Sequence, residues 1–352
     1  QLLDVDVGRL AQERGAGGRV RLAGGARLQH LHQLEVLAFS GEHRLERRGG
    51  LIDAGMQIQS NGIDLEVEDS GERDRPAVLL IMGLGMQLTA WPEAWVAALR
   101  QAGYRVVRFD NRDAGLSTSF DHLGVPNLLW AGLKHKVGWR QKPAYTLSDM
   151  ASDALGVLDA LGVAQAHVVG ASMGGMIAQR VALLAPQRVL SLTSIMSSSG
   201  AADLPDPDPG VLRQLYSPPA QAGLEGAVDH ALAFLKLIAS PAWPQPDAVL
   251  REQIVRAMRR SHRPAGVLRQ TLAVMADSAR AQALRDVRAP TLVIHGQADR
   301  MVPLACGEDT ARRIAGAELC VVPGMGHDFA PGASQRMLDA LLPFLMQHTT
   351  LT

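Results

Sequence analysis

The chain has 352 residues, of which 47% are hydrophobic, so it can form one large α/β domain with an insertion or two ordinary domains. Its 35 basic and 35 acidic residues give a formal net charge of zero, which argues against a nucleic acid or an anionic membrane as the main partner. The two cysteines, Cys306 and Cys320, lack the spacing of a zinc site, and we expect reduced thiols, no metal, no cofactor and a cytoplasmic location.

Residues 1–50 differ from the rest of the chain in composition. Glycine and arginine recur in them without a sustained periodicity, as at residues 14–19 and 47–50. A segment of this kind has too little apolar periodicity to form a packed core. We therefore expect residues 1–50 to be a disordered or loosely attached extension that contributes no site.

Residues 51–199 predict the first part of a folded core. Asn61-Gly62 is a strong signal for a hairpin turn between extended segments at 57–60 and 63–68. Thr146, with Asp149 three residues later, fits the start of a helix, where such a pair forms a capping box. A continuous apolar run at 77–82 is typical of a strand buried on both faces. The patterns further predict helices at 95–102, 147–161 and 173–184 and strands at 104–109, 166–170 and 189–195.

Residues 200–285 interrupt this alternation of strands and helices. Three prolines open the region, and it shows helical patterns at 224–237, 247–260 and 265–276 but no strand pattern. Strands are predicted again at 291–295 and 318–322, followed by a helix at 334–346. Strands that alternate with helices form a mainly parallel sheet with helices on both faces. We therefore expect an α/β core of residues 51–199 and 286–352, with residues 200–285 inserted as a helical cap above the carboxyl ends of the strands, where such sheets bind ligands.

The segment Gly170-Ala171-Ser172-Met173-Gly174 places the pattern Gly-x-Ser-x-Gly between a predicted strand and a predicted helix. This arrangement is typical of a nucleophile elbow, a turn so tight that the serine adopts a strained backbone conformation. The two glycines lack the side chains that would collide across the turn. The turn also places the hydroxyl at a helix N-terminus, where free N–H groups can stabilise a developing negative charge. Ser172 is therefore our candidate nucleophile.

Two later loops supply the partners that a serine nucleophile needs. Asp299 follows the first strand after the cap, and His327 lies in a glycine-rich loop after the last strand. The chain order serine, acid, histidine is the one that this kind of elbow uses. His327 can remove the serine proton and return it to the leaving group, while Asp299 can hold the imidazole in the required tautomer. Asp328 and Glu308 compete with Asp299 for that role.

The oxyanion formed during attack needs two preset N–H donors. We expect one from Met173, directly after the nucleophile, and the other from Leu84 in the loop after the third predicted strand. Gly83, Met86 and Met325 are our candidates for the substrate pocket, because flexible methionine side chains form adaptable apolar surfaces. Ordinary core packing explains the methionines equally well.

Four segments of the chain resemble the α/β-hydrolase superfamily, and the resemblance extends from residue 56 to the C-terminus. These segments are Leu80-Ile81-Met82-Gly83, Phe109-Asp110-Asn111-Arg112-Asp113-Ala114-Gly115-Leu116-Ser117-Thr118, Gly170-Ala171-Ser172-Met173-Gly174 and Pro323-Gly324-Met325-Gly326-His327. Within the superfamily they are most similar to the aclacinomycin methylesterase-like branch. The resemblance implies an α/β-hydrolase fold, a serine esterase activity, and the triad and oxyanion donors named above. Many members have His-Gly where this chain has Met82-Gly83, which should not abolish a donor that belongs to the backbone.

These observations predict a serine hydrolase that cleaves a small or medium hydrophobic carboxylic ester through an acyl-enzyme on Ser172. Another acyl reaction on the same triad stays open, namely acyl transfer, peracid formation, or cleavage of a carbon–carbon or amide bond. A non-catalytic ligand-binding protein with this fold also stays open. We expect a small-molecule ester as partner, no nucleic acid and no membrane span, because no apolar run is long enough. The sequence leaves the oligomeric state open.

Other polar residues near these motifs are expected to have structural roles. Asp110, Arg112 and Asp113 follow a strand, and we expect them to brace the loop under the site through salt bridges. His167 and His295 lie within predicted strands, and we expect both to be structural histidines with satisfied hydrogen bonds.

Overall fold

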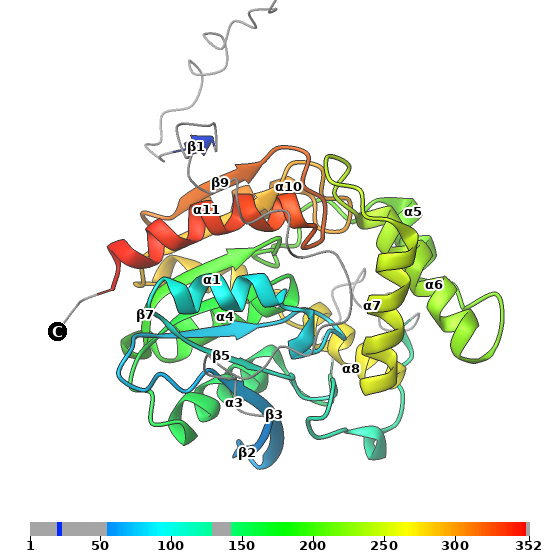
Figure 1. Ribbon diagram of the computed structural model, residues 1–352, viewed down its shortest axis with the longest axis horizontal. Helices are drawn as coiled ribbons and strands as arrows, with labels where there is room; N and C mark the ends of the chain where they lie inside the picture. The colour runs from blue at the N-terminus through cyan, green and yellow to red at the C-terminus, as the bar shows by residue number, and fades with distance from the viewer. Residues whose placement is uncertain (1–19, 23–54, 129–141, 350–352) are drawn as a thin grey trace, which may run out of the picture.

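The structure of the protein is a computed structural model that describes residues 20–22, 55–128 and 142–349 (Figure 1). In these residues nine strands form one sheet in the order β1-β9-β8-β7-β6-β4-β5-β3-β2. β3 is antiparallel to both of its neighbours, and the other neighbouring strands are parallel. The predicted mainly parallel sheet is therefore confirmed. The strands are β1 Val20–Leu22, β2 Met56–Ser60, β3 Ile63–Asp69, β4 Ala77–Ile81, β5 Arg105–Phe109, β6 Ala166–Ala171, β7 Val189–Ile195, β8 Thr291–Gly296 and β9 Glu318–Val322.

Helices cover both faces of the sheet. The core helices are α1 Glu93–Gln101, α3 Leu147–Ala160, α4 Met173–Leu184, α10 Leu304–Arg313 and α11 Pro331–Gln347. α3 and α4 contribute to a hydrophobic cluster on one face, and α1 and α11 contribute to a second cluster on the other face (Figure 1). The strands β4, β6 and β8 are buried along their whole length, which explains why their sequences are largely apolar without alternation.

Two local signals form as predicted. Asn61 and Gly62 have φ values of 49° and 78°, so both central residues of the β2–β3 hairpin have the positive φ that a tight two-residue turn requires. At the start of α3, the Asp149 N–H donates to Thr146 Oγ1 at 3.1 Å, and the Thr146 N–H donates to the Asp149 carboxylate at 2.7 Å. This reciprocal pair is the capping box that fixes the first turn of the helix.

Between β7 and β8 the chain forms the helices α5 Pro209–Tyr216, α6 Gly223–Ile238, α7 Asp247–Arg260, α8 Pro264–Met275 and α9 Arg280–Ala283. The helices α5 to α8 lie together at one end of the sheet (Figure 1). The sequence pattern does not predict α5, because Pro209 belongs to a run of closely spaced prolines that indicates an irregular segment. Proline is tolerated in the first turn of a helix, and here the Asp208 carboxylate accepts hydrogen bonds from the Gly210 and Val211 N–H groups. We propose that residues 200–285 act as the cap.

Of residues 1–50, the structure describes the short strand β1. It pairs in parallel with β9 at the edge of the sheet. The sequence predicts no element there, because three residues are too few to show a periodicity. The rest of the predicted N-terminal extension lies outside the described residues. None of the described helices combines the length and the apolar character needed to cross a membrane.

Buried salt bridges attach the cap to the loop after β5. Arg269 of α8 binds both carboxylate oxygens of Asp113 at 2.7 and 2.8 Å, with the two side chains 2% and 0% exposed. Arg260 of α7 lies 2.7 Å from the carboxylate of Asp110. Arg112 pairs instead with Asp153 of α3 at 2.6 Å. The expected bracing by salt bridges is confirmed, and two of its three partners belong to the cap.

Replacing Arg269 tests the attachment of the cap. Arg269→Met should lower the free energy of unfolding by about 3–5 kcal/mol, because it leaves the buried carboxylate of Asp113 without its positively charged partner. Arg251→Met is the matched control, since Arg251 makes exposed ion pairs within the cap that should contribute at most about 1 kcal/mol. Urea unfolding of the three proteins at pH 7 measures both effects. Equal losses of unfolding free energy in the two variants would contradict the attachment of the cap through Arg269.

The same comparison should depend on pH. Burial by itself raises the pKa of Asp113, but hydrogen bonds from Arg269, the Phe120 N–H and Tyr145 outweigh burial and hold that pKa below its ordinary value. A lowered pKa stabilises the fold above the ordinary carboxyl range, and this contribution is lost as the pH falls through the pKa of the folded state. The stability difference between wild type and Arg269→Met should therefore shrink in acid.

Candidate active site

The backbone at Ser172 has the strained conformation that the elbow motif predicts. Its φ and ψ are 55° and −122°, between the end of β6 and the start of α4. A Cβ atom on Gly170 would lie 2.1 Å from the Gly174 carbonyl oxygen, and one on Gly174 would lie 2.0 Å from the Ile81 carbonyl oxygen. Both positions therefore require glycine. The Ser197 hydroxyl donates to the Ser172 carbonyl at 2.7 Å, which helps to hold the turn.

The structure brings together the three side chains proposed as a triad. The Nε2 atom of His327 lies 3.0 Å from Ser172 Oγ, and its Nδ1 atom lies 2.7 Å from Asp299 Oδ2. The other carboxylate oxygen, Oδ1, accepts hydrogen bonds from the Met301 and Val302 N–H groups at 2.9 and 2.7 Å. With Nδ1–H donating to the buried carboxylate, Nε2 is free to accept the serine proton. This geometry can activate a serine nucleophile.

The loop proposed to supply an oxyanion donor lies against Ser172. A Cβ atom on Gly83 would lie 3.1 Å from Ser172 Cβ and 3.6 Å from its Oγ, so the backbone at Gly83 passes directly beside the hydroxyl. Leu84 is the next residue of this loop, and Met173 is the first residue of α4. Within the described ranges, neither the Leu84 nor the Met173 N–H is used in a turn or cap hydrogen bond between backbone groups. Leu84 and Met173 therefore stay the predicted oxyanion donors.

A segment of the cap holds the loop that contains His327. The Ile238 carbonyl accepts from the His327 N–H at 2.7 Å. The fully buried Ser240 accepts from the Gly326 N–H at 2.9 Å, and its hydroxyl donates to the Asp328 carboxylate. The Ser240 N–H also donates to that carboxylate at 3.1 Å. Asp328 therefore positions the loop and faces Ser240, whereas Asp299 faces the imidazole.

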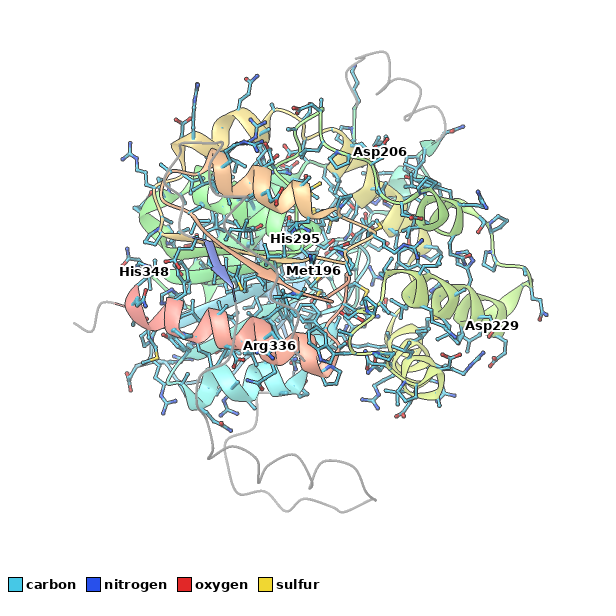
Figure 2. All side chains as sticks on the ribbon, turned by 90° about the horizontal axis from the view of Figure 1, so that it is seen from above. Met196, Asp206, Asp229, His295, Arg336 and His348 are labelled. Carbon is cyan, nitrogen blue, oxygen red and sulfur yellow. The ribbon has the colours of Figure 1, made fainter. Side chains whose placement is uncertain are left out.

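The two histidines within strands, His167 of β6 and His295 of β8, differ in how many of their ring nitrogens are hydrogen-bonded. His167 binds Ser191 Oγ at 2.7 Å and Thr349 Oγ1 at 3.0 Å, as expected of a structural histidine. The Nε2 atom of His295 lies 2.8 Å from the Val302 carbonyl, but its buried Nδ1 atom has no hydrogen-bond partner in the described residues. Burial lowers the pKa of His295. The expectation of a fully satisfied His295 is therefore wrong for one ring nitrogen. His295 is fully buried, and the Met196 N–H donates to the carbonyl of the preceding residue, Ile294, at 2.8 Å (both residues are labelled in Figure 2).

The three candidate pocket residues lie in different surroundings. Gly83 borders the serine, as described above. Met86 is 45% exposed, in the loop after β4, whereas Met325 is fully buried in the hydrophobic cluster beneath α11. The role of all three in a substrate pocket stays a prediction. Among the described residues there is no group of three or more His, Cys, Asp or Glu side chains arranged to hold a metal ion.

The family described as alpha/beta hydrolase fold matches residues 76–331 of the chain. The chain is 30% identical to rhodomycin D methylesterase DnrP from Streptomyces peucetius, over 77% of this chain and 91% of that protein. It is 28% identical to the putative carbamate hydrolase RutD from Caulobacter sp. strain K31, over 81% and 96% of the two chains. A solved structure of a hydrolase from Pseudomonas aeruginosa is 28% identical, with a TM-score of 0.61, and covers 83% of this chain and 98% of that one.

The chain therefore belongs to the α/β-hydrolase fold family. Within the family it is similar to methylesterases of the aclacinomycin methylesterase-like branch, as the sequence motifs indicated. Several of its relatives are named as hydrolases, among them methylesterases and putative carbamate hydrolases.

The cap residues that contact the site are not predicted from the sequence. Ser240 and Gln270 are buried polar residues in the cap, and both contact loops beside the proposed triad. Neither belongs to a motif. The one available signal was a polar pair, Arg269-Gln270, within the otherwise apolar pattern of α8. Such a pair suggests buried partners but does not identify them.

Replacing Ser240 tests whether the cap positions the histidine loop. Ser240→Ala removes the acceptor of the buried Gly326 N–H and the hydroxyl that donates to the Asp328 carboxylate, so His327 should shift. We expect kcat for an ester to fall by up to about 100-fold with little change in KM. Ser217→Ala is the control, because the Ser217 hydroxyl bonds locally to the Gln214 carbonyl within the cap. A higher KM with kcat unchanged would show that Ser240 serves substrate binding instead.

Proposed function

We propose that this protein is a serine esterase that cleaves a small or medium hydrophobic carboxylic ester. One observation supports this most strongly: Ser172, His327 and Asp299 form a continuous hydrogen-bonded chain at a strained elbow. The relatives named as methylesterases support an ester with a small alcohol group. A hydrophobic acyl portion agrees with the predominantly apolar lining that small-molecule sites usually have.

The proposed reaction has two stages. The Ser172 hydroxyl attacks the ester carbonyl carbon while Nε2 of His327 takes the serine proton. The resulting imidazolium, stabilised by Asp299, gives this proton to the alcohol as the C–O bond breaks, which leaves an acyl group on the serine. Water then attacks the acyl carbon with the same base and acid assistance, and the carboxylic acid leaves as the hydroxyl of Ser172 is restored.

The negative charge that develops on the carbonyl oxygen needs fixed donors. In this proposal the N–H groups of Leu84 and Met173 donate to it from opposite sides of the elbow. The Met173 N–H lies in the first turn of α4, where the helix dipole also favours negative charge. Losing one donor of this kind typically lowers turnover by about a hundred- to a thousandfold.

A second reaction on the same triad is supported by the relatives named as putative carbamate hydrolases. The putative carbamate hydrolase is similar over 81% of this chain, and cleavage of a C–N bond requires the same attack on a carbonyl carbon. Ester and carbamate substrates with the same acyl portion therefore give the most useful comparison. An acyl acceptor other than water would make the protein a transferase, with the same acyl-enzyme intermediate.

A series of p-nitrophenyl esters from acetate to longer acyl chains tests the ester proposal. Turnover by Ser172→Ala should fall on the order of a millionfold below wild type, to the background rate. Ser148→Ala, with its serine in the first turn of α3, should retain the wild-type rate. The acyl length with the highest kcat/KM then gives the size of the pocket.

Two results would contradict the ester proposal. Equal rates in wild type and Ser172→Ala would remove the serine from the mechanism. No turnover of any ester by wild type, with turnover of a carbamate that depends on Ser172, would favour the second reaction.

A further inference from the structure

We propose that Gln270 on cap helix α8 is a positioning residue for residues 83–86, the loop after β4 that we call the oxyanion loop. This proposal rests on the role proposed for Leu84 as an oxyanion donor. Gln270 is fully buried. Its Oε1 atom accepts a hydrogen bond from the Gly85 N–H at 2.7 Å, and its Nε2 group donates to the Arg112 carbonyl at 2.8 Å. One side chain of the cap thus joins two loops of the core.

The contact with Gly85 fixes the type of turn that holds Leu84. The Met86 N–H donates to the Gly83 carbonyl at 3.2 Å, so residues 83–86 form a four-residue turn. Gly85, the third residue, has a φ of 67°, whereas Leu84 is not among the residues with positive φ. This combination defines a type II turn. The more common type I turn has the opposite orientation of the peptide between Leu84 and Gly85.

That peptide is the group that Gln270 contacts. If it turned over, the Leu84 carbonyl oxygen would replace the Gly85 N–H, and two oxygen atoms would face each other in a buried space. The amide of Gln270 cannot reverse to accommodate this without losing its bond to the Arg112 carbonyl. The glutamine therefore stabilises the turn that begins at Gly83, whose backbone lies beside Ser172, and that contains Leu84.

The surroundings of Gln270 hold it in place. Its neighbour Arg269 makes the buried ion pair with Asp113, and Val267 of the same helix packs against Gly85, where a Cβ atom would lie 2.6 Å from Val267 Cγ2. On the same core loop, the Gln87 amide donates to the carbonyls of Ala257 and Ser261 at the end of α7. The cap is thus attached to the oxyanion loop at more than one point.

Gln270→Met tests this role, because methionine has a similar volume but neither hydrogen-bonding group. We expect kcat for a p-nitrophenyl ester to fall by about 100-fold while KM changes only a few-fold, as for loss of an oxyanion donor. Gln270→Glu, whose carboxyl group can still accept from the Gly85 N–H, should recover part of kcat. Gln214→Met is the control, since Gln214 bonds to His230 within the cap. If Gln270→Met does not fold, Gln270→Glu and Gln270→Asn allow the same comparison.

A second readout separates positioning of the oxyanion loop from general damage. A trifluoromethyl ketone of the preferred acyl length forms an adduct with the serine whose oxyanion needs the two donors, whereas the matching methyl ketone binds without one. Gln270→Met should weaken the trifluoromethyl ketone by about the same factor as kcat and leave the methyl ketone unchanged. Equal weakening of both ketones, or effects no larger than those of Gln214→Met, would overturn the proposal for Gln270.

The trifluoromethyl ketone also separates a failure of the role of Gln270 from a failure of the proposed esterase function. If wild type forms no adduct by fluorine NMR, the serine mechanism itself fails. If wild type forms the adduct and Gln270→Met forms it equally tightly, only the role of Gln270 fails.

Discussion

The left-handed backbone at Ser172 is the constraint on which the site depends. A serine rarely adopts a φ of 55° unless its surroundings compel it, and here β6, α4 and two close glycine contacts do so. β6 is the middle strand of the nine described strands, so the turn is supported by neighbouring strands on both sides. Because the turn lies at the carboxyl ends of parallel strands, the loops after β4, β8 and β9 meet at the same place. The strained turn thus presents the Ser172 hydroxyl to His327 and to the Gly83 backbone.

The cap contributes to this geometry through buried polar contacts. Ser240 holds the histidine loop, and Gln270 contacts the loop proposed to supply an oxyanion donor. Arg269 and Arg260 add ion pairs to the loop after β5. A cap attached in this way cannot move away as a rigid body without leaving buried donors and acceptors unpaired, which costs about 1–3 kcal/mol for each neutral group. The cap is therefore part of the framework that sets the distances in the site.

The sequence predicted those features that depend on local patterns. The elbow, the β2–β3 hairpin and the capping box of α3 each require particular residue types within a few positions, so they could be recognised directly. The contact between Gly85 and Gln270 joins residues 185 positions apart, and no local pattern encodes it. Asp299 and Asp328 show the same limit. Asp328 directly follows His327 in the sequence, and Asp299 lies in the loop after β8. Only the structure shows that Asp299 bonds to the imidazole while Asp328 bonds to Ser240.

The most direct test of the central claim is to trap the acyl group on the enzyme. Wild type mixed with excess p-nitrophenyl ester, stopped with acid in the first turnovers and digested, should give one peptide with the mass of the acyl group, located by fragmentation at Ser172. The Ser172→Ala protein treated in the same way should give none. An acyl group on another residue in wild type, or hydrolysis by wild type with a burst of p-nitrophenol but no acylated peptide, would contradict the account.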